Sequence, residues 1–219
     1  MIRKIAAHYI FPINDKPLKN GIITIDENGK ILEIKQETKN LDSITGLEFY
    51  SGILVPGFVN THCHLELSHM KGKIPTHTGL PGFVSQIMKI RQATPEDILK
   101  AAKSADISMY YNGIVAVGDI SNNELTFEIK NNSKINYHTF LEIFSVNPSL
   151  ALEKFNQAVE LQNKLQNFNL ASSIVPHAPY TVPPEMFKLI RAHSLENKKT
   201  ISIHNQECLA ENEFSIKKS

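Results

Sequence analysis

The sequence predicts an α/β protein of the (β/α)8 TIM-barrel type, truncated after about five strands and preceded by a small β subdomain. Short β-branched apolar runs alternate with amphipathic stretches from Ile53 onward, a pattern typical of parallel strands connected by helices. Histidines and other polar residues follow the ends of the first, fourth and fifth runs, where barrel active sites lie. The chain has no glycine-rich phosphate loop of the kind found in many open sheets, so a barrel is favoured.

The composition is that of an ordinary globular protein. Of the 219 residues, 42% are hydrophobic and 21% are charged, and the formal net charge is +1. No cluster of Lys or Arg indicates a nucleic-acid or membrane surface, and no apolar stretch approaches a membrane span. The N-terminal residues lack the apolar core of a signal peptide, and two cysteines, Cys63 and Cys208, do not make a disulfide framework. We therefore expect a cytoplasmic protein that binds neither nucleic acid nor membrane.

Residues 1–52 are expected to form the small β subdomain. Two isoleucine-rich runs flank Asn28-Gly29, which is a strong hairpin signal. Helical periodicity is scarce in this part of the chain. Residues 53–219 are then the first part of the barrel domain.

The barrel part is predicted to contain five strands and three main helices. The strands are expected in the runs that start at Ile53, Gly113, Ile135, Leu170 and Thr200. Thr94 is an N-cap followed by proline, and it begins a helix that stops at Gly113. Further helices are expected over 148–168 and from about Pro183, and residues 122–132 show a less regular helical pattern.

His62 and His64 end the first barrel strand. Because side chains alternate along a strand, both point to one face while Cys63 points to the other. Two imidazoles so placed can bind one divalent ion, although two ordinary surface histidines would show the same pattern. His204 ends the fifth strand and offers a third imidazole, although alone it would be taken for a core histidine. Catalytic metal sites keep one position open for water, and Glu207 would then shuttle protons as general acid and base.

His177 and Glu66 are further candidates. His177 ends the fourth strand, and it either orients or polarises a substrate group or caps the following helix together with Thr181. The residues alone give these two interpretations equal weight. Glu66 follows the histidine pair and is either a substrate-binding carboxylate at the pocket mouth or a solvated loop acid. The expected partner is therefore a small-molecule substrate.

Three segments together resemble the amidohydrolase superfamily. LVPGFVNTHCHLELSHMKG is similar to the first-strand motif of that superfamily, and PHAPYTV is similar to its fourth-strand motif. IHNQE is similar to the fifth-strand H-x-x-E of the branch that holds cytosine deaminases, chlorohydrolases and adenosine-type deaminases. The motifs occur in family order, and the resemblance covers essentially the whole chain. The residues HLE (64–66) and LSH (67–69) look most like those of aminodeoxyfutalosine deaminases.

The resemblance implies a role for each candidate. His62, His64 and His204 would bind one divalent ion, Zn or Fe, Glu207 would be the acid/base, and His177 would contact the substrate. Binuclear members carry a carboxylated lysine at the end of strand four, where this chain has PHAP, so one metal ion is implied. The N-terminal subdomain would be the first part of the small β-sandwich of the family. The implied activity is hydrolytic deamination of a nucleoside or heterocycle by metal-activated water, and a homodimer is compatible with it.

Two alternatives stay open. A chlorohydrolase or cyclic-amide hydrolase would use the same site, and a truncated metal-binding remnant would keep the ligands without turnover. Members of the superfamily need eight strands, a strand-six histidine and a strand-eight aspartate, and a barrel takes roughly 250 residues. The polypeptide as given is therefore expected to be poorly active and to associate through unpaired strand edges.

Overall fold

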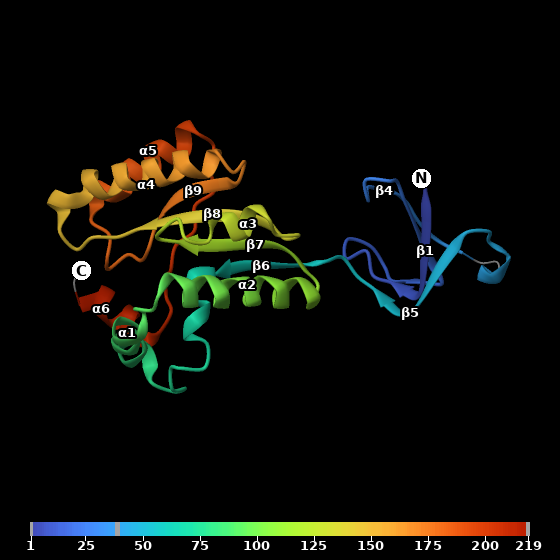
Figure 1. Ribbon diagram of the computed structural model, residues 1–219, viewed down its shortest axis with the longest axis horizontal. Coiled ribbons are helices and arrows are strands. Elements are labelled where there is room, and N and C mark those ends of the chain that lie inside the picture. The colour runs from blue at the N-terminus through green and yellow to red at the C-terminus, as the bar shows by residue number, and fades with distance from the viewer. Residues whose placement is uncertain (1, 38–39, 218–219) are drawn as a thin grey trace. The chain divides into compact units, whose positions relative to one another are not determined.

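Figure 1 shows the computed structural model, which describes residues 2–37 and 40–217. The chain divides into two compact units between Gly57 and Phe58. The sequence pattern predicts the change of structure at residue 53, whereas Ile53 and Leu54 still pair with the first strand of the N-terminal sheet. The interruption comes at Pro56-Gly57, where proline has no N–H to donate to a strand ladder.

The N-terminal unit is a five-stranded sheet. Its strands are β1 (Arg3–Ile10), β2 (Leu18–Lys19), β3 (Gly21–Ile25), β4 (Ile31–Gln36) and β5 (Leu47–Leu54). The order is β2-β1-β3-β4, and β5 pairs in parallel with β1. The hairpin predicted at Asn28-Gly29 is confirmed: β3 and β4 pair antiparallel, and Gly29 has a φ of 79°, which glycine adopts without strain. The carboxylate of Asp26 closes the turn by accepting hydrogen bonds from the backbone N–H groups of Asn28 and Lys30.

The second unit contains a four-stranded parallel sheet with helices connecting its strands, which confirms the predicted α/β class. The strands lie in the order β6 (Phe58–Cys63), β7 (Ile114–Ser121), β8 (Asn136–Ile143) and β9 (Ala171–Pro176). The connecting helices are α1 (Gly79–Ile90), α2 (Pro95–Tyr111), α3 (Phe127–Asn131) and α4 (Ala151–Gln166), and α5 (Pro184–Glu196) and α6 (Leu209–Lys217) follow β9. The short 3₁₀ helices η2 (Leu65–Met70) and η3 (Pro148–Leu150) follow β6 and precede α4. No helix in the described part of the chain is long and apolar enough to cross a membrane.

The predicted helices from Thr94, over 148–168 and from Pro183 are confirmed within a few residues. Thr94 is the N-cap of α2, and its side chain accepts a hydrogen bond from the N–H of Asp97. Helix α1 was not predicted, because Gly79, Pro81 and Gly82 all disfavour a helix interior. They occupy only its first turn, where a missing N–H costs nothing.

The prediction of a regular fifth barrel strand is wrong. Residues 200–206 carry no strand assignment. The amide of His204 donates a hydrogen bond to the carbonyl of His177 at 2.8 Å, but no ladder joins this segment to β9 within the described residues. β9 ends at Pro176, which lacks the N–H group that a continuing ladder would need.

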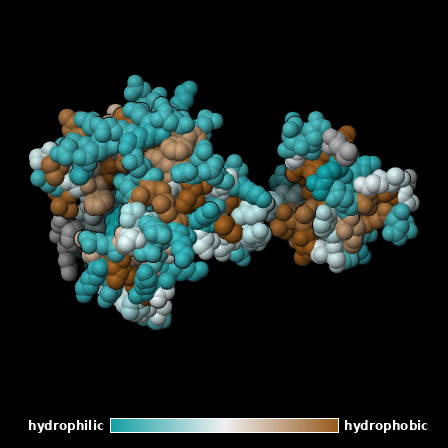
Figure 2. All heavy atoms as spheres, viewed as in Figure 1, coloured by the Kyte–Doolittle hydropathy of each residue, from teal (hydrophilic) through white to brown (hydrophobic). Residues whose placement is uncertain are grey.

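The core of the second unit lies mainly between β8, β9 and the helices α4 and α5. Its largest cluster includes Leu141, Leu165, Ile174, Met186 and Ile190, all almost fully buried. A second cluster lies between β7, η2 and α2 and includes Leu65, Ala102 and Val117. Hydrophilic residues predominate over the outer sides of α4 and α5, as expected for amphipathic helices with one buried face (Figure 2).

A fully buried ion pair lies inside the second unit. Lys130 of α3 and Asp119 of β7 are each 0% exposed, and their Nζ and Oδ2 atoms lie 2.5 Å apart. Lys130 Nζ also donates to the hydroxyl oxygens of Ser121 and Thr139. The other oxygen of Asp119 accepts a hydrogen bond from the backbone N–H of Leu65 at 2.7 Å. The pair therefore fixes the chain just after β6 to β7, β8 and α3.

We predict that Lys130→Met destabilises the protein strongly. The substitution keeps most of the side-chain volume but leaves the Asp119 carboxylate buried without its cation. Breaking one side of such a pair costs about 3–5 kcal/mol of the free energy of unfolding. Urea denaturation followed by circular dichroism measures the change.

The matched control is Lys164→Met, which removes the cation from the exposed pair with Glu124. Exposed pairs contribute less than about 1 kcal/mol, so this variant should unfold close to the wild type. Equal destabilisation by the two substitutions would contradict the special role of the buried pair.

Candidate metal centre and active site

The three predicted metal ligands come together in the structure. His62 lies on β6, His64 follows that strand directly, and His204 lies in the segment 200–206. The ligand atoms of the three residues lie within 4.8 Å of one another. Cys63 points to the opposite face, where it packs against the hydrophobic cluster around Leu65, as the alternation along a strand requires.

The three imidazole rings form a compact group. The ring centroids of His62 and His204 lie 4.6 Å apart, and those of His64 and His204 lie 5.4 Å apart in a stacked arrangement. Tetrahedral zinc with bonds of 2.0–2.1 Å holds its ligand nitrogens roughly 3.4 Å apart. Small side-chain rotations would therefore bring the three nitrogens onto one ion.

Burial and hydrogen bonding prepare these rings for a cation. Burial lowers the pKa of His64 to about 4, so this ring is neutral at pH 7 and offers a nitrogen lone pair. Burial, with repulsion from His204, also lowers the pKa of His62. The hydrogen bond with Glu142 raises the pKa of His204, so this ring is the most readily protonated of the three. An incoming cation must displace that proton, since metal ligands bind deprotonated.

Glu142 is a site residue that the sequence analysis missed. It lies at the end of β8, its side chain is 4% exposed, and its Oε1 lies 3.2 Å from His204 Nε2. Burial alone would raise the pKa of Glu142, but the hydrogen bond with His204 and attraction to His177 lower it on balance. One signal was available in the sequence: a lone acid among the apolar residues Phe140, Leu141 and Ile143 at the end of a strand run.

Glu207 lies on the other side of His204. Its Oε1 is 3.4 Å from His204 Nδ1, and its side chain is 35% exposed. The backbone N–H of Glu207 donates to Glu211 Oε2 at 2.7 Å. The predicted acid/base is thus adjacent to the imidazole cluster and accessible to solvent.

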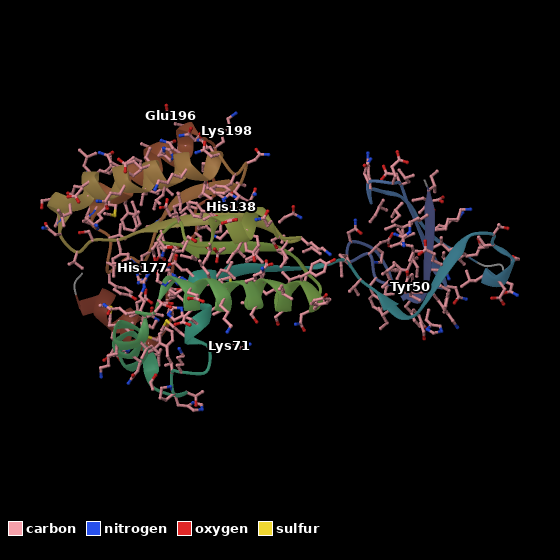
Figure 3. All side chains as sticks on the ribbon, in the orientation of Figure 1. Tyr50, Lys71, His138, His177, Glu196 and Lys198 are labelled. Carbon is pink, nitrogen blue, oxygen red and sulfur yellow. The ribbon has the colours of Figure 1, made fainter. Side chains whose placement is uncertain are left out.

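His177 also joins the cluster, at the end of β9 (Figure 3). Its ring centroid lies 5.1 Å from that of His204, and its Nδ1 lies 2.8 Å from Thr181 Oγ1. The interpretation of His177 and Thr181 as helix caps is wrong, because α5 begins at Pro184 with Pro183 as its N-cap. The ring is therefore held toward the other histidines.

Glu66 is buried, because the residue is only 3% exposed. The interpretation of Glu66 as a solvated loop acid is therefore wrong. Its carboxylate accepts hydrogen bonds from Arg91 at 3.4 Å and from the backbone N–H of Asn122 at 3.2 Å. Burial raises the pKa of Glu66 to about 7 despite both contacts, so near neutral pH only part of the molecules carry the ion pair. A substrate contact by Glu66 stays a prediction.

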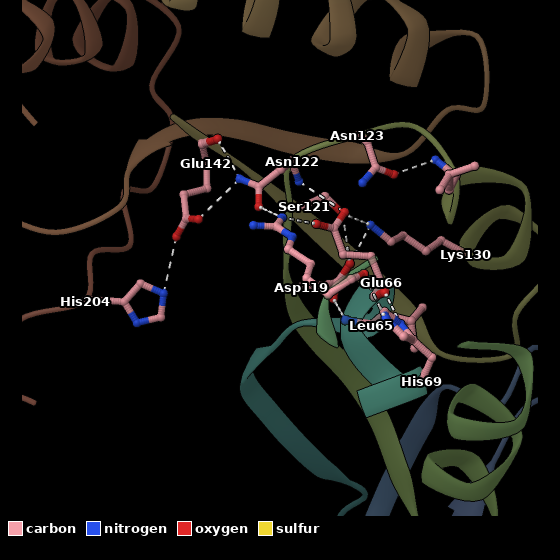
Figure 4. Close-up of polar contacts among 12 residues, drawn as sticks. Leu65, Glu66, His69, Asp119, Ser121, Asn122, Asn123, Lys130, Glu142 and His204 are labelled. Carbon is pink, nitrogen blue, oxygen red and sulfur yellow. Dashed lines mark hydrogen bonds and ion pairs between the residues drawn. The ribbon is translucent and has the colours of Figure 1, made fainter. Parts of the chain in front are cut away.

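Asn122 connects Glu66 with Glu142, as Figure 4 shows. Its side-chain amide donates to the backbone carbonyl and to Oε2 of Glu142 at 3.0 and 3.2 Å. The oxygen of the same side chain accepts a hydrogen bond from Arg91 at 3.0 Å. The chain Glu66–Asn122–Glu142–His204 thus runs from the turn after β6 to the imidazole cluster, and the sequence analysis did not foresee its middle members.

Comparisons with known proteins agree on one family. The sequence model of the amidohydrolase family matches residues 53–218. An adenosine deaminase from Helicobacter pylori is 26% identical over 216 residues, which cover 96% of this chain and 52% of that protein. A 5-methylthioadenosine/S-adenosylhomocysteine deaminase from Halothermothrix orenii is 25% identical over 230 residues, covering 98% of this chain and 51% of that protein.

A solved structure shows the same fold. The crystal structure of Helicobacter pylori aminofutalosine deaminase in complex with methylthio-coformycin matches with a TM-score of 0.79 and 25% identity. The match covers 94% of this chain and 52% of that one. The chain spans about half the length of the relatives it matches, which agrees with the prediction of a truncated (β/α) barrel with a parallel sheet.

We predict that His62→Ala or His64→Ala lowers the zinc content of the purified protein below that of the wild type. Each substitution removes one of three imidazoles that can meet at one ion, and three protein ligands are the usual number in catalytic zinc sites. Elemental analysis after dialysis against trace zinc measures the content. Cys63→Ala is the matched control, because this residue lies between the two histidines but faces the core, and it should keep its zinc. Equal zinc in all variants would show that the cluster is not the binding site.

Proposed function

The chain belongs to the amidohydrolase family, and from this premise we propose that it carries the metal site and the acid/base of a deaminase that acts on purine nucleosides. The observation that carries the proposal is the position of Glu207, 3.4 Å from one of three clustered imidazoles. A metal-binding cluster with an adjacent, solvent-accessible carboxylate is what hydrolytic deamination requires.

The donor set fits one divalent ion, with zinc or iron as the proposed metal. Three imidazoles suit both ions, and His62 and His64 have pKa values that keep them neutral at pH 7. An ion held by His62, His64 and His204 would lower the pKa of a water molecule, which makes it a nucleophile at neutral pH. Proton transfer and orientation of the substrate would be carried out by side chains of this chain.

Glu207 is proposed to move the proton. Its carboxylate accepts a proton from the attacking water and returns it to the amino group that leaves as ammonia, so a C–N bond is exchanged for a C–O bond. The hydrogen bond from its backbone N–H to Glu211 fixes the segment that carries Glu207. His177 is proposed to orient the heterocycle, because its ring faces the cluster from the end of β9.

The proposed substrate class is adenosine and adenosines modified at the 5′ position. The names of the two sequence relatives specify adenosine, 5-methylthioadenosine and S-adenosylhomocysteine, which share one nucleoside. Assays of ammonia release should use the full-length polypeptide that contains these residues, with each of the three compounds. Chloride release from a chlorinated triazine without ammonia from the nucleosides would favour a chlorohydrolase. Zinc binding without any turnover would favour a non-catalytic remnant. A cytoplasmic location remains a prediction from the sequence.

We predict that Glu207→Gln lowers kcat for ammonia release by about 10²–10⁴-fold while the metal content stays unchanged. Glutamine keeps the shape and hydrogen-bonding capacity of the side chain, but it cannot carry the proton. Glu153→Gln changes an exposed acid on α4 in the same way and should retain full activity. A Glu207→Gln variant as active as this control would refute the assigned role.

A further inference from the structure

A second group of candidate ligands lies beside the three-histidine cluster. Glu142, His177 and His204 also bring one ligand atom each within 4.8 Å of one another. They come from three successive segments: the end of β8, the end of β9 and residues 200–206. We propose that these three side chains form a second seat for a divalent cation, which shares His204 with the seat formed by His62 and His64.

The hydrogen bonds of His177 fix which of its nitrogens is available. The single hydroxyl proton of Thr181 is donated to the carbonyl of Ala178 at 3.1 Å. Thr181 Oγ1 therefore accepts from His177 Nδ1–H at 2.8 Å, which leaves the lone pair of the neutral ring on Nε2. A histidine that donates one ring N–H to an oxygen while its other nitrogen faces a cluster has the arrangement of a metal ligand.

Glu142 is held in place in a similar way. Asn122 donates hydrogen bonds to its backbone carbonyl and to Oε2, and Arg91 in turn holds the oxygen of Asn122. The remaining carboxylate oxygen, Oε1, points at His204 Nε2 over 3.2 Å. The carboxylate is thus positioned by partners outside the proposed seat, and one of its oxygens is directed into it.

The two seats differ in charge. Three imidazoles, each neutral when it binds a metal, make up the first seat, whereas two imidazoles and a carboxylate make up the second. Two histidines with one carboxylate is a ligand set that proteins use for Zn²⁺ and for Fe²⁺. Because both seats need the lone pair of His204, an ion in one seat weakens the other, and one tightly held ion per chain is expected. An ion in the second seat would also bind His177. In that form of the protein, His177 is not free to orient a substrate.

The test measures zinc binding to the full-length polypeptide by competition with a chromophoric chelator. In the double variant His62→Ala/His64→Ala the second seat should still bind Zn²⁺, with an affinity below that of the wild type, so that saturation requires more zinc than the trace amounts that fill the wild type. Adding Glu142→Gln to this background removes a direct ligand, and the affinity should fall by more than the 10–100-fold that losing an outer hydrogen-bond partner costs. Adding Thr181→Val instead should cost about 10–100-fold. Adding Glu124→Gln, an exposed acid of the same type, should change nothing.

A double variant that folds, as shown by a cooperative thermal melt, and binds no Zn²⁺ would overturn the proposal. Equal affinity with and without Glu142→Gln would also overturn it. Should the double variant fail to fold, the visible spectrum of the Co²⁺-loaded wild type decides: two seats give two overlapping species, and Glu142→Gln leaves one. An unchanged Co²⁺ spectrum in Glu142→Gln would refute the second seat. None of these measurements uses ammonia release, so their outcome is independent of the deaminase proposal.

Discussion

The buried ion pair between Asp119 and Lys130 determines where the candidate ligands lie. Removing two charges from water costs several kcal/mol per ion, so such a pair persists only where every polar atom has a partner. Here Lys130 also binds Ser121 and Thr139, and the second oxygen of Asp119 accepts from the amide of Leu65. Leu65 directly follows His64. A carboxylate on β7 therefore sets the direction in which the chain leaves β6, and with it the position of the histidine pair.

Next to the Asp119–Lys130 ion pair, a chain of polar contacts crosses the carboxyl ends of the strands (Figure 4). Asn122, which follows β7, contacts Glu66 through its backbone N–H and Glu142 through its side chain. Glu142 then contacts His204. Each of these groups is at least partly buried, so leaving any of them unpaired would cost more than the hydrogen bond itself contributes. The orientation of Glu142 therefore depends on residues from several segments far apart in the sequence.

This dependence explains which features the sequence predicts and which it does not. The alternation of His62, Cys63 and His64, the N-cap at Thr94 and the hairpin at Asn28-Gly29 are local, because the residues that decide them are neighbours in the chain. The approach of Glu142 to His204 needs the register of parallel strands, which no local pattern contains. The fifth strand was predicted from its own composition, but a strand also needs a neighbour whose N–H and C=O groups can pair with it. Glu66 looked like a surface acid because its partners, Arg91 and Asn122, lie many residues away.

A cation bound by His204 would hold segment 200–206 in place, in addition to its chemical role. Without a strand ladder, this segment is linked to its surroundings by the amide of His204 and by the contacts of the His204 ring with Glu142 and Glu207. A cation bound by His204, by His62 on β6 and by His64 after it would join segment 200–206 directly to the first strand of the parallel sheet. Strands β7 to β9 already hold segment 200–206 close to the histidine pair. Joining the two with a cation would therefore cost little further conformational entropy of the chain. The free energy of that binding would add to the stability of the folded form, as it does wherever a ligand binds only the folded state. In the proposed metal-bound form, the positions of this segment and of Glu207 would therefore depend on the bound cation.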